Sequence, residues 1–265
     1  MNTELAFRLN ETRRFLKAIT LSPEGRKFLL SHVFNTFLLT FVLITSIFLV
    51  LVTLHEGVQF RRRSLAISFS ILFTMLILIP IFTMPFFSFK DITNKLSRLV
   101  FKREFFTSLS THVFYHQSRK GEITLHLAKA HSVLTEKYRL VKNYQAKPGR
   151  RTISRDLALS ISRSIREAVR LSKDFVKHGR LKSDQKIVGA TYGYLFGAAK
   201  SKLKLNRIEP GWFKRYIGTL FYRFGALHAV FMYFVINEKL PPSFDPVYFN
   251  ARVGDVIGNP SADPS

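Results

Sequence analysis

The chain contains no cysteine, one tryptophan and few acidic residues. Across 265 residues, 17 Asp plus Glu stand against 41 Lys plus Arg, a formal net charge of +24. The absence of cysteine excludes disulfide bonds and thiolate metal ligands. The sequence also lacks a Walker motif, a G-x-G-x-x-G loop, an H-E-x-x-H motif and a nucleophile elbow. No catalytic residue, metal site or cofactor is therefore predicted, and the chain is not expected to be an enzyme.

Charged residues are missing altogether from two long stretches, residues 33–54 and 64–89. Both stretches exceed the ~20 apolar residues that a helix needs to cross the hydrocarbon core of a membrane. More than 30 mostly polar residues precede the first stretch, which argues against a secretory signal peptide. Few soluble helices lack a polar face over this length, so a pair of buried core helices is the weaker alternative. We therefore predict a cytoplasmic N-terminal helix over residues 1–30 and a two-helix transmembrane hairpin over residues 31–90.

The basic residues around these stretches predict the orientation of the hairpin, because flanking Lys and Arg favour the cytoplasmic side. Ten basic residues precede the first stretch or follow the second: Arg13, Arg14, Lys17, Arg26, Lys27, Lys90, Lys95, Arg98, Lys102 and Arg103. The loop between the stretches holds only Arg61, Arg62 and Arg63. Both termini are thus expected in the cytoplasm. The Arg triplet is then either an anchor at the outer face or, in an oligomer, a ring of positive charge at a pore mouth.

Small polar side chains inside the first stretch share one helix face. Asn35, Ser46 and Thr53 fall within ~20° of one another at 100° per residue. They could line a water-filled path through a membrane. Serine and threonine also pack between helices by bonding their own backbone, and that alternative stays open.

The region beyond residue 89 carries 32 Lys plus Arg and 13 Asp plus Glu. Its pattern predicts an all-α domain over residues 91–240, with helices on either side of Lys120 and Gly121, and an extended tail over residues 241–265. The four-residue spacing of Gly189, Gly193 and Gly197 predicts a helix face without side chains, which allows close packing. Residues 216–236 are expected to form a buried or interfacial helix rather than a third span, because a charged Arg223 lies near their middle.

A helix predicted from Ser154 to Gly179 carries a stripe of basic residues on one face. Its members recur at spacings of three and four: Arg163, Arg166, Arg170, Lys173 and Lys177. Glu167 and Asp174 are expected to pair with Arg163 and Arg170. Further basic residues add to the predicted ligand-binding set: Arg150, Arg151, Arg155, Lys200, Lys202, Lys204 and Arg207. A solvated surface is one interpretation; the other is a site for a run of phosphates on a nucleotide or nucleic acid.

The hairpin with its RRR triplet, the stripe within "ISRSIREAVRLSKDFVK" and the absence of a catalytic site together resemble the membrane effectors of bacterial antiphage systems. The chain is most similar to the Hailong-type channel effector. That resemblance implies a homo-oligomeric, anion-selective channel of the bacterial inner membrane, with a tetramer as the expected assembly. It also implies gating by a single-stranded DNA oligomer or other nucleotide-derived ligand, supplied by an operon-partner nucleotidyltransferase, and depolarisation of the host membrane. The residues alone leave a second hypothesis open, a non-channel membrane tether that holds nucleic acid among the membrane lipids.

Overall fold

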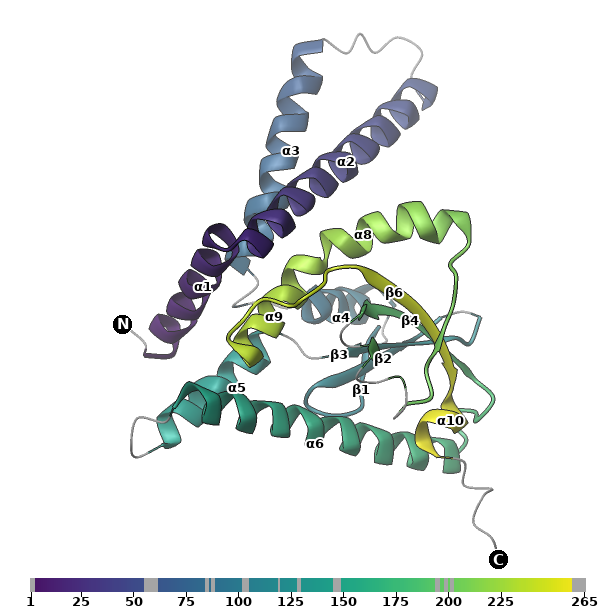
Figure 1. Ribbon diagram of the computed structural model, residues 1–265. Coiled ribbons are helices and arrows are strands. Elements are labelled where there is room, and N and C mark those ends of the chain that lie inside the picture. The colour runs from purple at the N-terminus through teal and green to yellow at the C-terminus, as the bar shows by residue number, and fades with distance from the viewer. Residues whose placement is uncertain are drawn as a thin grey trace, which may run out of the picture.

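The computed structural model describes residues 3–54, 62–83, 86, 89–101, 105–118, 120–127, 130–144, 149–193, 196–197, 200 and 203–258. Two long helices, Pro23–Leu54 and Arg62–Thr83, form a helical arm that projects from the rest of the structure. The rest is a domain in which helices surround a six-stranded mixed sheet (Figure 1). The helices are α1 (Thr3–Leu21), α2 (Pro23–Leu54), α3 (Arg62–Thr83), α4 (Phe89–Phe101), α5 (Ala130–Asn143), α6 (Arg150–Lys177), a π-helical segment (Lys214–Gly218), α8 (Thr219–Phe224), α9 (Ala226–Asn237) and α10 (Val253–Ile257). The strands are β1 (Thr107–Ser108), β2 (Val113–Gln117), β3 (Ile123–Leu127), β4 (Lys186–Tyr192), β5 (Asn206–Arg207) and β6 (Pro246–Arg252).

The sheet has the strand order β1-β2-β3-β4-β6-β5. Neighbouring strands run antiparallel except β3 and β4, which run parallel. A parallel pair needs a crossover connection, and here α5 and α6 supply it. The strands are rich in β-branched and aromatic residues, as in "KIVGATY" of β4 and "PVYFNAR" of β6, which suit a half-buried pleated surface.

The prediction of an all-α domain is wrong, because residues 107–127 form β1, β2 and β3 where two helices were expected. The tail prediction also missed a strand, since β6 lies inside the sheet between β4 and β5. "VFYHQ" shows no alternation of apolar and polar residues, whereas "ITLHL" alternates strictly, a five-residue strand signal that the prediction of a helix overlooked. Pairing of β2 with β1 and β3, which are its neighbours along the chain, holds these segments extended.

The prediction of two transmembrane helices also needs correction. Within the described residues, one helical segment, Pro23–Ile47 of α2, is long and apolar enough to cross a membrane by length and composition. The apolar part described in α3, Ile67–Leu78, is shorter. The second uncharged stretch extends to residue 89, but α3 ends at Thr83, two residues before Pro85 in the sequence. The described helix is therefore shorter than the uncharged stretch.

The largest hydrophobic core joins segments that lie far apart in the sequence. Phe15 and Phe28 pack with Leu134 of α5, Leu157 of α6 and Phe231 of α9. The segment expected to be a buried or interfacial helix divides at Gly225 into α8 and α9, and α9 is buried in this core, which confirms the expectation for α9. A second core lies between the sheet and the C-terminal half of α6. The shared core therefore packs α1 and the base of α2 together with α6.

A buried ionic network holds α1 against the domain. The Lys137 ammonium group lies 2.9 Å from Glu11 Oε2 and donates to the carbonyl oxygen of Val235 at 2.8 Å. Glu238 accepts from both Lys137 and Arg14, and Arg14 also bonds Glu11. Two cations thus face two carboxylates from α1, α5 and the end of α9. Hydrogen bonds from Arg14 and Lys137 outweigh the opposing effect of burial and lower the pKa of Glu238.

The glycines expected on a helix face have a different role. Gly189 lies in β4 directly opposite Phe249 of β6, and the Phe249 ring covers the space that a side chain would occupy. A Cβ added at Gly189 would lie 2.8 Å from Phe249 Cζ. The expectation of close contact is correct for Gly189, but the contact joins two strands rather than two helices.

Replacing Gly189 with alanine should lower the free energy of unfolding by about 1–3 kcal/mol, because the buried Phe249 ring has to move. Urea unfolding in detergent, followed by circular dichroism, measures the change. Gly197→Ala is the matched control, since nothing lies within 4 Å of a Cβ added there. Equal unfolding midpoints for the two variants would contradict the close packing at Gly189.

Candidate anion-binding surface and adjoining pocket

The basic residues predicted on one helix face lie on the exposed side of α6. We define the α6 basic face as Arg155, Arg163, Arg166, Arg170, Lys173 and Lys177, which are all exposed. The opposite side of the helix buries Leu157 and Ala168 against the rest of the domain. The helix type and the stripe follow from the 3.6-residue period, although α6 begins at Arg150 rather than Ser154.

The cations of this face lack the acidic partners that the sequence predicts for them. Among the described residues, no carboxylate lies within 4.0 Å of the charged groups of Arg163, Arg166, Arg170, Lys173 and Lys177; the ion pair on this face joins Arg155 Nε to Asp156 Oδ1 at 3.6 Å. The predicted pairs of Glu167 with Arg163 and of Asp174 with Arg170 are therefore not formed. Repulsion between like charges stays uncompensated along the face, and a bound polyanion would relieve it.

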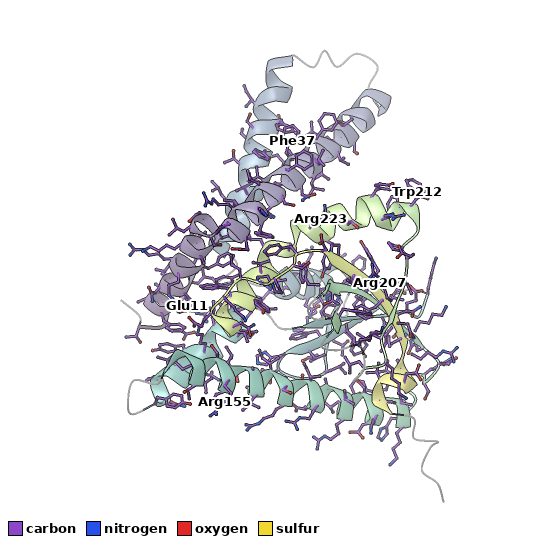
Figure 2. The ribbon with its side chains drawn as sticks, viewed as in Figure 1. Glu11, Phe37, Arg155, Arg207, Trp212 and Arg223 are labelled. Atoms are coloured by element: carbon purple, nitrogen blue, oxygen red, sulfur yellow. The ribbon has the colours of Figure 1, made fainter. Side chains whose placement is uncertain are left out.

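The other predicted ligand-binding residues are not all gathered beside this face. Arg150 and Arg151 begin α6, but their side chains lie outside the described residues, as does Lys202. Lys200 and Lys204 are exposed between β4 and β5, and Arg207 lies in β5 at the edge of the sheet. Figure 2 shows Arg155 on the outer side of α6 and Arg207 on the opposite side of that helix, by the sheet. The structure thus separates Arg207 from the α6 basic face.

The predicted pore residues differ in their surroundings. Asn35 is buried, and its side-chain amide donates to the carbonyl oxygen of Ser31 at 2.5 Å. Ser46 is exposed and donates to the carbonyl oxygen of Val42. Arg61 and the side chains of Thr53, Arg62 and Arg63 lie outside the described residues. In the isolated chain, Asn35 and Ser46 thus donate hydrogen bonds to the backbone of their own helix, which is the alternative to a pore lining.

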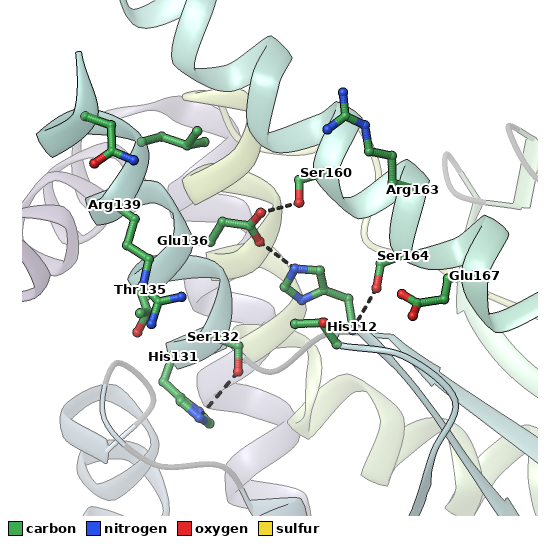
Figure 3. Close-up of a pocket in the computed structure, with 13 residues that line it drawn as sticks. His112, His131, Ser132, Thr135, Glu136, Arg139, Ser160, Arg163, Ser164 and Glu167 are labelled. Carbon is green, nitrogen blue, oxygen red and sulfur yellow. Dashed lines mark hydrogen bonds and ion pairs between the residues drawn. The ribbon is translucent and has the colours of Figure 1, made fainter. Parts of the chain in front are cut away.

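A pocket of about 630 Å³ opens between α5 and α6 (Figure 3). Glu136 lies at its centre, where His112 Nε2 donates to Glu136 Oε2 at 2.6 Å and Ser160 donates to Glu136 Oε1. His112 and Ser160 bond the carboxylate rather than each other, so the serine–histidine contact of an activated nucleophile is missing from this trio. Arg163 borders the pocket, but its guanidinium points away from Glu136. The polar groups at the centre of the pocket mainly hold α5, α6 and the turn before β2 together.

The charge of Glu136 makes this junction sensitive to acid. The hydrogen bond from His112 is the largest cause that lowers the pKa of Glu136 below its ordinary value of 4.5, and the Ser160 hydroxyl adds to it. A carboxyl group whose pKa is lower in the folded state contributes stability above pH 4.5 and loses it as the pH falls through the lowered pKa.

We expect Glu136→Gln to reduce stability at neutral pH and to flatten its decline below pH 4.5, because glutamine has no proton to gain. Urea midpoints of the native and variant proteins, compared over a pH series, measure this effect. Glu167→Gln, at an exposed carboxylate on the edge of the same pocket, is the control. Parallel pH curves for the native protein and Glu136→Gln would contradict the role of the Glu136 charge.

Within the described residues, no group of three or more His, Asp or Glu side chains is placed to hold a metal ion. His112 and His116 have the four-residue spacing of paired metal ligands on a helix, but His112 bonds Glu136 while His116 lies in a strand and stacks on the ring of Phe105. No protein-family model, curated protein or solved structure matches the chain. The functional interpretation therefore rests on the geometry of this chain alone.

Proposed function

We propose that the chain is a membrane-attached protein whose α6 basic face binds a run of phosphates on a soluble ligand. A single-stranded DNA oligomer or another nucleotide-derived polyanion has the matching chemistry, because each phosphate that meets a cation releases counterions. The observation that carries this proposal is the arrangement in Figure 1, where α6 and the helical arm lie on opposite sides of the domain.

Membrane attachment is supported by the apolar surface of the arm. Along α2, Leu30 is 72 % exposed, and Phe34 and Phe41 are more than half exposed. Ile67 and Ile71 of α3 are similarly exposed. Soluble proteins rarely present so much contiguous apolar surface to water, whereas the hydrocarbon core of a membrane accepts it. The bacterial inner membrane, with α1 and the domain together on its cytoplasmic side, fits the flanking basic residues.

The position of α6 favours a soluble polyanion over membrane lipids as its ligand. Attraction to anionic lipid head groups falls off within about 10 Å of the surface at physiological salt. Cations next to the arm lie in that field, but α6 lies on the opposite side of the domain from the arm (Figure 1), with Arg155 on its outer side (Figure 2). A phosphate-rich ligand in the cytoplasm can reach this face without approaching the membrane.

The test is binding of a fluorescent single-stranded DNA oligomer to the full chain in detergent, measured by anisotropy over a salt series. Six phosphate contacts should give a slope of about −4 in the plot of log affinity against log salt concentration. Extraction of cell membranes at alkaline pH tests the attachment, because embedded protein stays in the pellet. A slope near zero would overturn the ligand assignment, and release into the supernatant would overturn the membrane assignment.

A ligand-gated, anion-selective homo-oligomeric channel is the second candidate, with a tetramer as the assembly. One observation favours it: Phe28 at the base of α2 and Leu157 of α6 belong to the same buried core. A ligand that shifts α6 can therefore act on α2 through packed side chains. The ligand would come from an operon-partner nucleotidyltransferase, and opening would depolarise the host membrane in antiphage defence. Planar-bilayer recordings that show no conductance, with or without oligomer, would reject this candidate in favour of a membrane tether.

A further inference from the structure

Three aromatic side chains stand exposed just before α8. Trp212 is 75 % exposed, Phe213 58 % and Tyr216 67 %. Trp212 and Phe213 pack edge to face, with ring centroids 5.9 Å apart. Aromatic residues normally bury their large apolar area, so an exposed group of three marks a surface that contacts something apolar.

The fold holds this group beside the membrane arm. Helix α8 packs against α2, and Thr219 at the start of α8 shares a 2.9 Å hydrogen bond with the Tyr248 hydroxyl of β6. Figure 2 shows Trp212 at the end of the α8 segment that is remote from α9, on the side of the domain that faces the arm. The aromatic group is therefore a second exposed apolar surface, separate from the arm, on the side of the domain that faces the arm.

The chemistry of the group matches the boundary between lipid and water. Tryptophan and tyrosine are enriched at that depth, because an apolar ring meets hydrocarbon while a polar NH or OH reaches the head groups. Arg215 is exposed between Phe213 and Tyr216, where a guanidinium can bond lipid phosphates. Aromatic rings with an adjacent cation are typical of segments that lie in the plane of an anionic membrane.

We propose that Trp212, Phe213 and Tyr216 insert into the head-group region of the leaflet that α2 enters, with Arg215 bonding lipid phosphates. This inference rests on the proposed membrane attachment. The arm gives one point of attachment and the aromatic group gives a second. Two separated attachments fix the tilt of the domain and keep the α6 basic face directed into the cytoplasm.

The experiment uses the single tryptophan of the chain, Trp212, as a fluorescent reporter. The full chain is reconstituted in phosphatidylcholine–phosphatidylglycerol vesicles that contain lipids brominated either near the head groups or near the chain ends. We expect shallow bromines to quench most of the Trp212 emission and deep bromines to quench little of it. Full access of aqueous acrylamide to Trp212, with no quenching by either lipid, would overturn the inference. Quenching by a DNA oligomer in place of lipid would assign the rings to nucleic-acid stacking and also overturn it.

A second reporter distinguishes failure of this inference from failure of membrane attachment. The Trp212→Phe, Phe34→Trp double variant moves the tryptophan to an exposed position on α2. Quenching of this reporter by lipid, without quenching of Trp212 in the native chain, would overturn the inference and leave the attachment intact. No quenching at either position would overturn both. Arg215→Gln should weaken the protection of Trp212 more in anionic vesicles than in vesicles of phosphatidylcholine alone, because the choline cation offsets the charge of the phosphate there.

Discussion

Replacing Lys137 with methionine is expected to lower the free energy of unfolding by about 3–5 kcal/mol, because it removes one of the two cations that compensate the carboxylates of Glu11 and Glu238. Lys137 is 3 % exposed and Glu11 is 2 % exposed. Without the Lys137 ammonium group, Arg14 alone faces the carboxylates of Glu11 and Glu238. Urea unfolding in detergent, followed by circular dichroism, gives the difference between the native protein and the variant.

The control for this variant is Lys142→Met, which removes an exposed cation from the same helix and should change stability by less than about 0.5 kcal/mol. The Glu11→Gln, Lys137→Met double variant should be destabilised by less than the sum of the two single changes, because each single change leaves the other charge buried. Strictly additive changes would show that Glu11 and Lys137 do not act as a pair.

Replacing Arg166, Arg170 and Lys173 together with alanine is expected to weaken binding of a single-stranded DNA oligomer about 100-fold at ~0.1 M salt. Each lost phosphate contact removes about 0.7 from the salt slope, so three contacts make the slope shallower by about 2. The side chains are exposed and make no ion pair among the described residues, so the fold should be unchanged. Anisotropy over a salt series measures both the affinity and the slope.

A matched variant removes the same total charge elsewhere, by replacing Arg13, Lys17 and Lys239 with alanine. These three residues are exposed and lie outside α6. Their loss should leave most of the affinity and the salt slope intact. An equal loss of affinity in the two triple variants would mean that the overall charge of +24, rather than the α6 basic face, attracts the ligand.

The sequence allowed prediction of α6 because its helical pattern repeats within one long continuous segment. Apolar residues on one side and basic residues on the other keep a helical period over 28 residues, and the helix ends just before Gly179, whose φ is +69°. The start was misplaced because Arg150, Arg151 and Thr152 have no apolar period that distinguishes them from a turn. The ion pairs expected for Glu167 and Asp174 are not formed, because a four-residue spacing on a helix permits an exposed ion pair but does not require one.

The pairing of β4 with β6 could not be predicted in the same way, because it joins segments far apart in the chain. Gly189 of β4 faces Phe249 of β6, sixty positions later, and only that contact explains the glycine. The buried network was missed as well, although one signal for it exists. Lys137 follows Val133 and Leu134 at the helical spacing of the apolar side of α5, where a lysine is unusual unless a carboxylate meets it.

The place of β6 determines when the domain can finish folding. This strand follows every other strand in the chain, yet it lies between β4 and β5 and contributes Phe249 and Ala251 to the second core. During synthesis, α2 leaves the ribosome roughly 200 residues earlier, while the sheet is still open, so the proposed membrane attachment can precede completion of the sheet. Until β6 arrives, the edge of β4 is unpaired and liable to join another nascent chain. The strand edge of β4 therefore stays exposed while roughly the next 60 residues, up to the end of β6, are synthesised.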